Sequence, residues 1–400
     1  MTVRSRSTRT SHPRIAGAAG NERGIALLIV LIVVALLTIT VTEFTYSVQI
    51  DQHRTRNAIH ALQAQLLARS GINLAEGFLM LDDEPMYDAY SEQWWQQLVE
   101  FCNGLQLEES MRIRCRVRDE SGKLNINNTR GARRTGTSNA TASKAVTPDV
   151  VLRDALRCLF QNRGINLEAI DKLTDYWAQE PTQLPNGQTQ EVPQFTSLED
   201  FGATFGIGAD DVRKLRGVVT AQRRDILRGI NVNTAPAEVL AAVLTDNAPG
   251  DCGPNDAVNE ILNRQCDPDQ PFKSTGDVRG VLKNIDNASA KASVFTVQSK
   301  LYRLEASAMT NVDPSDPSGG GIGQTLSSLV ARHQGLSVNK QNQSPQVGPN
   351  GKPIPNWTLR PVDWQKEGGA RLFRDTADQD PCNHNEDQED KEERDSEESR

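Results

Sequence analysis

Apolar and polar positions divide the chain into an unbroken apolar run, an amphipathic continuation and a long mixed body. Residues 25–42 contain no charged side chain, and as a helix they are about 27 Å long, close to the apolar thickness of a bilayer. No proline occurs between Pro13 and Pro85, and downstream of the apolar run large apolar residues recur at steps of three and four. We therefore predict one helix from Ile25 to about Leu81, with a transmembrane first part and a stalk that packs on a folded head.

The apolar run differs from a secretory signal that is removed. Such signals have apolar regions of about 7–15 residues and end at a small-x-small cleavage site, which the sequence after residue 37 lacks. The first 24 residues hold five arginines and one glutamate. This basic flank predicts a cytoplasmic N-terminus and a single-pass protein whose C-terminal part lies outside the cytoplasm. In a Gram-negative cell this means the inner membrane and the periplasm. An ordinary single-span anchor is the alternative.

The start of the apolar run has a further feature. The sequence RGIALL, in which Gly24 precedes Ile25, resembles a type IV prepilin processing site. There a membrane peptidase cuts after the glycine, so residues 1–24 would be a leader, and the mature chain would begin at Ile25 and keep its anchor.

The body alternates between strand and helix patterns. Met111–Asn127 reads as a β-hairpin, residues 149–285 as helices, and Val294–Met309 and Gln324–His333 as strands. This order predicts an α+β fold in which a helical domain is inserted between the strands of an antiparallel sheet. The expected divisions are residues 1–24 (leader), 25–42 (transmembrane helix), 43–128 (stalk and first part of the α/β domain), 149–285 (inserted helical domain), 294–335 (remaining strands) and 336–400 (disordered, acidic tail).

Charge is distributed unevenly along the chain. Residues 375–400 contain twelve acidic and three basic residues, a net of −9, within a total of −8. Because the leader contributes about +4, the rest of the chain is close to neutral, which does not favour binding to a polyanion. The composition of residues 336–400 predicts disorder and a solubilising role.

Six cysteines fit an oxidising compartment, and none has the spacing of a zinc site. We expect disulfides between Cys252 and Cys266 and between Cys102 and Cys115. Side chains with oxygen ligands are concentrated at both ends of the segment between Cys252 and Cys266. They are Asp251, Asn255, Asp256, Asp267 and Asp269. On a loop closed by a disulfide they suit Ca²⁺, and the alternative is that they are solvated loop residues without a cofactor.

Several segments together resemble one known family. They are DESGKLNINN (119–128), LTDYW (173–177), FTSLEDFGATFGI (195–207), INVNTAPAEVLAAV (230–243), PFKSTGDV (271–278) and VQSKLYRLEASA (297–308). With these segments in this order after the possible processing site at Gly24, the chain resembles the minor pseudopilin K family of the type II secretion system. The resemblance implies a pilin-like fold with a large helical insertion, a place at the tip of the periplasmic pseudopilus, and minor pseudopilins I and J and prepilin peptidase as partners. It also gives calcium more weight, because minor pseudopilins of this kind are associated with it.

The fifth residue of the expected mature chain is unusual for a pilin. Most pilins carry Glu there, where it offsets the amine of a neighbouring subunit inside the bilayer, whereas this chain has Ile29. An unpaired carboxylate in lipid costs several kcal/mol. A subunit with no neighbour on that side does not need one, and the resembled family shares this absence.

The rival function is a membrane-anchored DNA receptor of the competence type. Phe205–Gly208 resembles the turn of a helix-hairpin-helix unit, whose amide groups can hold a DNA phosphate. Asp210 and Asp211 stand where the phosphate would approach, so we expect no nucleic acid partner and a structural or protein-contact role for the hairpin. No arrangement of the five histidines with a nucleophile indicates catalysis, so we predict no enzyme and no catalytic residue.

Overall fold

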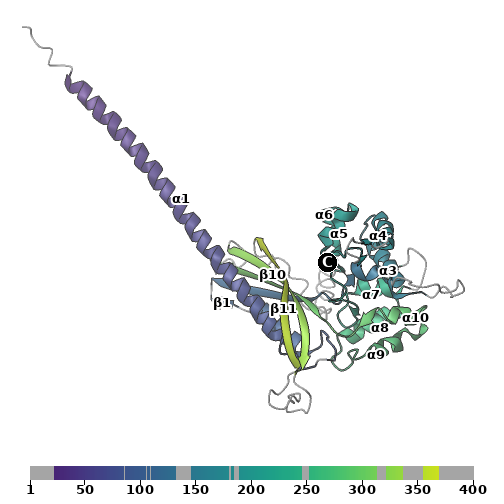
Figure 1. Ribbon diagram of the computed structural model, residues 1–400. Coiled ribbons are helices and arrows are strands. Elements are labelled where there is room, and N and C mark those ends of the chain that lie inside the picture. The colour runs from purple at the N-terminus through teal and green to yellow at the C-terminus, as the bar shows by residue number, and fades with distance from the viewer. Residues whose placement is uncertain are drawn as a thin grey trace, which may run out of the picture. The chain divides into compact units, whose positions relative to one another are not determined.

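The computed structural model describes residues 22–84, 86–104, 106–108, 110–131, 146–179, 182–183, 189–245, 252–312, 321–336 and 355–368. The chain forms two compact units, Met1–His60 and Ala61–Arg400. Helix α1 (Glu22–Leu79) has 58 residues and belongs to both, which confirms the predicted long helix (Figure 1).

In the second unit, α1 packs closely on a sheet. Its inward positions are mostly small and at most 1% exposed, namely Ala64, Ala68, Ile72, Ala75 and Leu79. A Cβ at Gly71 would lie 3.0 Å from Ala306 Cβ and 3.2 Å from Ile113 Cγ2. Gly71, which the sequence marks only as a weak point in a helix, therefore permits the close approach of helix and sheet.

The sheet has five antiparallel strands in the order β1-β2-β9-β10-β11. Their bounds are Gln106–Glu108, Met111–Asp119, Leu301–Thr310, Ile322–Leu336 and Pro355–Gly368. Helix α2 (Gln93–Gly104) packs beside β2, and Trp94 and Trp95 are buried in the core that α1, α2 and the sheet form. The predicted α+β class is confirmed.

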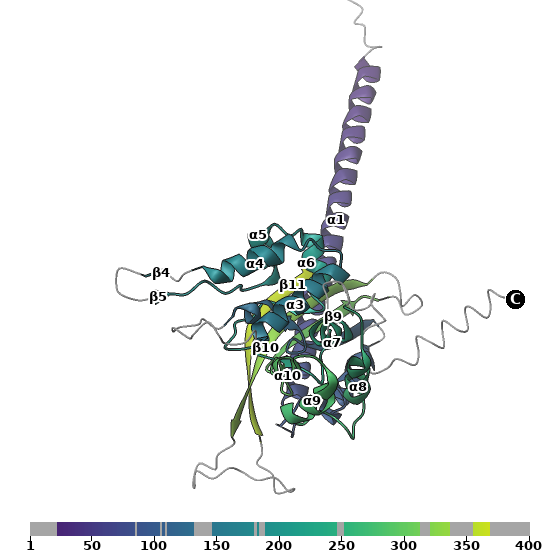
Figure 2. The same cartoon turned by 90° about the vertical axis from the view of Figure 1, so that its right-hand side faces the viewer.

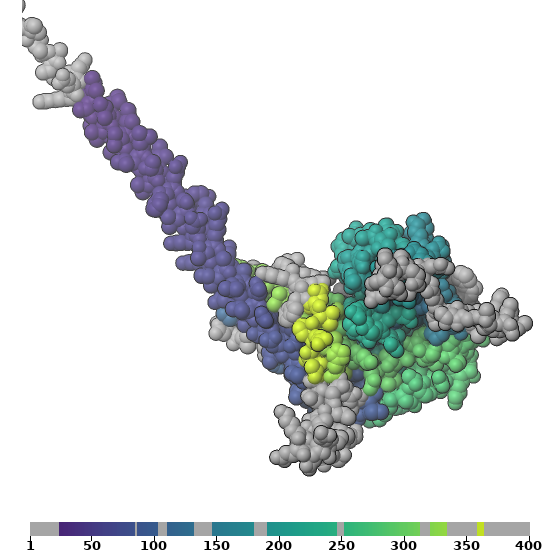
Figure 3. Space-filling view, viewed as in Figure 1, coloured from purple at the N-terminus to yellow at the C-terminus, as the bar shows by residue number. Residues whose placement is uncertain are grey.

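Strand β11 contradicts the prediction of disorder for its part of residues 336–400. It pairs with β10 along its whole length, with a register shift between Leu329 and Val330 that leaves Val362 without a partner. Pro361 is tolerated because β11 is an edge strand, which Figure 3 shows in yellow at the surface. Proline and this bulge interrupt the alternation that marks a strand, and this explains the error. The other residues of the predicted tail that follow Gly368 lie outside the described residues.

The predicted hairpin at Met111–Asn127 is also wrong. After β2 the chain turns at Ser121-Gly122 and enters β3 (Leu124–Asn125), which pairs in parallel with β6 (Val219–Thr220). A Cβ at Gly122 would lie 2.5 Å from the Thr234 carbonyl oxygen, so glycine is required where the two segments meet. The turn thus leads into the helical region rather than back along the sheet.

The helical region lies on one side of the sheet (Figures 1 and 2). Its helices are α3 (Pro148–Asn162), α4 (Glu168–Ala178), α5 (Leu198–Phe205), α6 (Ala209–Leu215), α7 (Ala237–Leu244), α8 (Asp256–Gln265), α9 (Thr275–Val281) and α10 (Ala288–Ala292), with 3₁₀ turns η1 (Ile126–Thr129) and η2 (Leu282–Asn284). Two short strand pairs complete it, β4 (Thr182–Gln183) with β5 (Thr189–Gln190) and β7 (Ile230–Asn231) with β8 (Phe295–Thr296). The helices of this region, with η1, η2, β7 and β8, share one large apolar core around Phe160, Phe201 and Phe272.

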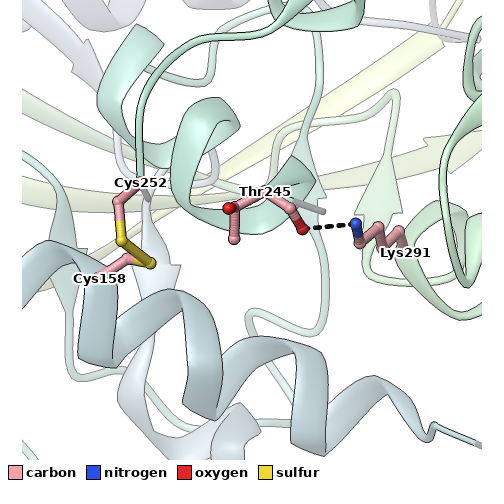
Figure 4. The surroundings of a disulfide bond; sticks show 4 residues. All are labelled: Cys158, Thr245, Cys252 and Lys291. Carbon is pink, nitrogen blue, oxygen red and sulfur yellow. Dashed lines mark hydrogen bonds between the residues drawn. A yellow bond between two sulfur atoms is a disulfide. The ribbon is translucent and has the colours of Figure 1, made fainter. Parts of the chain in front are cut away.

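Two disulfides have both of their cysteines among the described residues, and both join elements of the second unit. Cys102 is bonded to Cys115, as the sequence predicts, with the Cα atoms 4.8 Å apart. The predicted Cys252–Cys266 pair is wrong, because Cys252 is bonded to Cys158 of α3 (Figure 4). The ten-residue helix α8 separates Cys252 from Cys266 by about 15 Å, too far for a disulfide. Cys266 is itself disulfide-bonded, to a different partner.

Candidate functional site

The exposed apolar surface of α1 is the first candidate functional feature. An 18-residue stretch of this helix has a mean hydropathy of 3.1, and none of it is buried. Threonine hydroxyls in and just after this stretch form their hydrogen bonds within the helix. Those of Thr38, Thr42 and Thr45 each donate to the backbone carbonyl four residues earlier. Such a surface is compatible with a bilayer, where unpaired polar groups are costly.

The predicted processing position lies at the start of this helix. Gly24 is in the first turn of α1, and a Cβ built on it would meet no atom within 4 Å. Ile25 and Ile29 are 60% and 55% exposed. No packing role within the described residues accounts for Gly24, while Ile29 presents an apolar side chain where a typical pilin has a carboxylate. The cleavage itself stays a prediction.

The quoted sequence motifs meet at a buried junction between the sheet and the helical region. We call five of its residues the junction cluster: Asp88, Asp119, Asn231, Thr234 and Ser299. The amide nitrogen of Asn231 donates to the Asp88 carbonyl at 3.0 Å and to Ser299 Oγ at 2.6 Å, and the hydroxyls of Thr234 and Ser299 both donate to Asp119 Oδ2. All five side chains are at most 4% exposed. Three motifs are thus joined by hydrogen bonds between residues that are 68 or more positions apart along the chain.

Two asparagines hold further motifs in the same way. Asn127 exchanges two hydrogen bonds of 2.9 Å with the backbone of Phe195, and Asn233 does the same with Phe272. A buried amide that satisfies both its donor and its acceptor fixes the relative position of two segments. The motifs therefore describe a scaffold.

Charged side chains are buried beside the junction cluster. Arg332 is 2% exposed and forms ion pairs with Asp82 and Asp88. Burial opposes ionisation of Glu120, but Lys123 at 2.6 Å and Arg303 at 3.0 Å outweigh it and lower its pKa to about 2. These charges are compensated, so they add rigidity rather than a site for a ligand.

The helix-hairpin-helix geometry is present but unsuited to DNA. Helices α5 and α6 are joined through Gly206, whose φ of 73° requires glycine. The cations of this hairpin are paired with acids: Arg213 with Asp210, Lys214 with Asp211 at 2.7 Å, and Arg216 with Glu199 at 2.8 Å. A phosphate would have to displace these carboxylates.

The predicted calcium ligands are dispersed among other roles. Asn255 caps α8 by accepting from Val258 N–H, Asp256 lies in the first turn of α8, and Asp267 accepts from the backbone of Asp269. Asp251 lies outside the described residues. Within the described part of the chain, no group of three or more His, Cys, Asp or Glu side chains could hold a metal ion. Calcium binding stays a prediction, but the Cys252–Cys266 disulfide that was expected to close the loop is not formed.

Comparisons with known proteins give a full-length relative. No protein-family model matches the chain. The chain is 26% identical over 370 residues to the type II secretion system protein K of Pseudomonas aeruginosa, and the alignment covers 86% of this chain and 98% of that protein. Among solved structures, a chain of the GspK-GspI-GspJ complex from the enterotoxigenic Escherichia coli type 2 secretion system matches with a TM-score of 0.46 and 17% identity, covering 79% of this chain and all of that one. With the quoted motifs and an alignment over nearly the whole length in agreement, the chain is identified as a homologue of type II secretion system protein K.

Proposed function

We propose that this protein is a minor pseudopilin of the type II secretion system that caps the periplasmic pseudopilus and helps to initiate its assembly for protein export. The observation that carries the proposal is the alignment with protein K over nearly the whole of both chains. The exposed apolar helix supports membrane anchoring in the inner membrane, and the basic flank before Gly24 supports a periplasmic head.

The tip position is supported by two separate features. The apolar Ile29 offers no carboxylate to a neighbouring subunit's amine within the bilayer. The helical region, residues 148–292, has a radius of about 14 Å by compact-domain scaling. Such a bulk on one head would collide with a subunit stacked above it, so it favours a terminal place. Immunogold labelling should mark one end of each filament, and label along the shaft would contradict this position.

Binding partners separate this function from the DNA-receptor alternative. We expect the unit Ala61–Arg400 to co-purify with minor pseudopilins I and J, the two proteins named with GspK in the solved complex. We expect no salt-dependent binding of duplex DNA, because the cations of the helical hairpin are already paired. Micromolar DNA affinity that charge reversal at Lys214 and Arg216 abolishes would favour the DNA receptor.

A further inference from the structure

An arginine-lined cavity in the helical region is not explained by the pseudopilin proposal. It has a volume of about 780 Å³ and lies between the start of α3 and the loop of residues 222–229. Its charged lining consists of Arg130, Arg223, Arg224, Arg228, Asp149 and Asp225. We call this feature the arginine cavity.

The positive charge of the arginine cavity is only partly compensated. Asp225 pairs with Arg223 at 2.8 Å, and Asp149 is already engaged by Arg153 at 3.0 Å. Within the described residues, the side chains of Arg224 and Arg228 have no ion pair. Arg130 pairs with Glu191, and Asp149 and Asp225 also attract the guanidinium groups of Arg224 and Arg228. The four arginines and two aspartates of the lining still leave a net positive charge.

The cationic wall is held in place by the backbone. Burial, followed by repulsion from Arg130 and Arg228, lowers the pKa of Arg224, yet an arginine stays charged at neutral pH. The Arg224 amide donates to Gln194 Oε1 at 2.9 Å, and Asn128 Nδ2 donates to the Arg228 carbonyl at 2.9 Å. The backbone that carries these arginines is therefore held in place, so less of the chain has to be ordered when an anionic ligand binds.

We propose that the arginine cavity binds the acidic C-terminal segment of the same chain, residues 375–400. This segment has twelve acidic and three basic residues, and carboxylates pair with guanidinium groups through charge-assisted hydrogen bonds. β11 ends at Gly368 on the same compact unit, so the segment is tethered to the body that contains the cavity. Tethering gives the segment an effective concentration of about a millimolar, above that of a free acidic partner. The segment thereby shields the cavity from other polyanions, which must compete with it.

Photo-crosslinking of the full chain in detergent tests this contact. A benzophenone amino acid replaces Ser293, the exposed C-cap residue of α10, which lines the arginine cavity. The control places it at Ser289, an exposed residue within α10 that does not line the cavity. We expect crosslinks from position 293 to peptides of residues 375–400, at least fivefold more abundant than from position 289. They should fall by a similar factor at about 0.5 M NaCl, where the Debye length is only a few ångströms.

Charge variants decide whether the arginines carry the contact. The double change Arg224→Glu and Arg228→Glu should abolish the crosslink, while Arg213→Glu, at an arginine outside the cavity, should leave it intact. A second variant, in which the twelve acids of the segment become their amides, keeps the cavity unchanged and should also abolish it. Equal yields from both positions, insensitivity to either variant, or crosslinks to added duplex DNA or an acidic protein instead of the segment would overturn the proposal. The test uses the isolated chain, so its outcome is independent of the secretion proposal.

Discussion

Single buried amides and carboxylates hold the second unit together, and their partners are distant in sequence. Asn231 is fully buried and contacts Asp88, Asp119 and Ser299, which lie 68 or more positions away. Local signals can be read from sequence: Ser197 is of a residue type that favours N-caps, and its side chain caps α5 by accepting from the Asp200 N–H. The role of Thr234 was not readable, because its hydroxyl donates to Asp119 instead of capping a helix, and α7 begins only at Ala237. A cap depends on neighbours in sequence, whereas the junction cluster depends on the tertiary fold.

Removal of the Asn231 amide should leave several buried polar groups without partners. We expect Asn231→Ala to lower the free energy of unfolding of the unit Ala61–Arg400 by about 2–4 kcal/mol. Asn259→Ala, at an exposed position within α8, should change it by less than about 0.5 kcal/mol. Urea unfolding followed by circular dichroism measures both, and equal effects would contradict the role of the junction cluster.

The buried carboxyl of Glu92 should make stability depend on pH. Burial, followed by repulsion from Asp82, raises its pKa to about 9, although the Ala89 N–H that it accepts opposes the shift. The folded state therefore binds a proton that the unfolded state releases near pH 4.5, so stability falls as pH rises from about 5 to 9. Glu92→Gln should remove this part of the slope and stabilise the protein at pH 8 by more than about 1 kcal/mol. Thermal unfolding at pH 5 and pH 8 tests it, and a variant with an unchanged slope would contradict the assignment.

At the scale of elements, the positions of helices were more predictable from sequence than the pairing of strands and of cysteines. The apolar run, the three- and four-residue periodicity and the absence of proline together predicted α1, and the order of patterns predicted the insertion of helices between strands. The parallel pairing of β3, the edge strand β11 and the Cys158–Cys252 disulfide were missed. Each joins segments whose proximity depends on the whole fold, and periodicity within one segment holds no information about its partner.

The two glycines of the stalk should respond in opposite directions to substitution. A side chain at Gly71 meets Ala306 and Ile113, whereas one at Gly77 meets no atom within 4 Å. We expect Gly71→Val to destabilise the unit Ala61–Arg400 by about 1–3 kcal/mol through overpacking. Gly77→Ala should stabilise it by about 0.5–1 kcal/mol, because alanine favours the helix. Chemical denaturation compares them, and a stabilising Gly71→Val would refute the close approach of α1 to the sheet.

At the scale of the whole molecule, the anchor and the resemblance to protein K were accessible from sequence. The apolar run is continuous, and the motifs lie in order along the chain. The arginine cavity was not accessible, because Arg130 and the arginines of residues 223–228 are brought together only by folding. The central claim is that the chain enters a pilus-like assembly with its apolar helix intact.

Processing at the Gly24–Ile25 bond tests this claim most directly. The protein and a prepilin peptidase are co-expressed, and the product is analysed by N-terminal sequencing and intact mass. Gly24→Val should block cleavage without disturbing packing, since nothing lies within 4 Å of that position, and Gly20→Ala within the leader should not. The account predicts a mature chain that begins at Ile25, with a methylated amino group, and retains the apolar helix. Recovery of the intact leader, or of a product that lacks the apolar run, would contradict it.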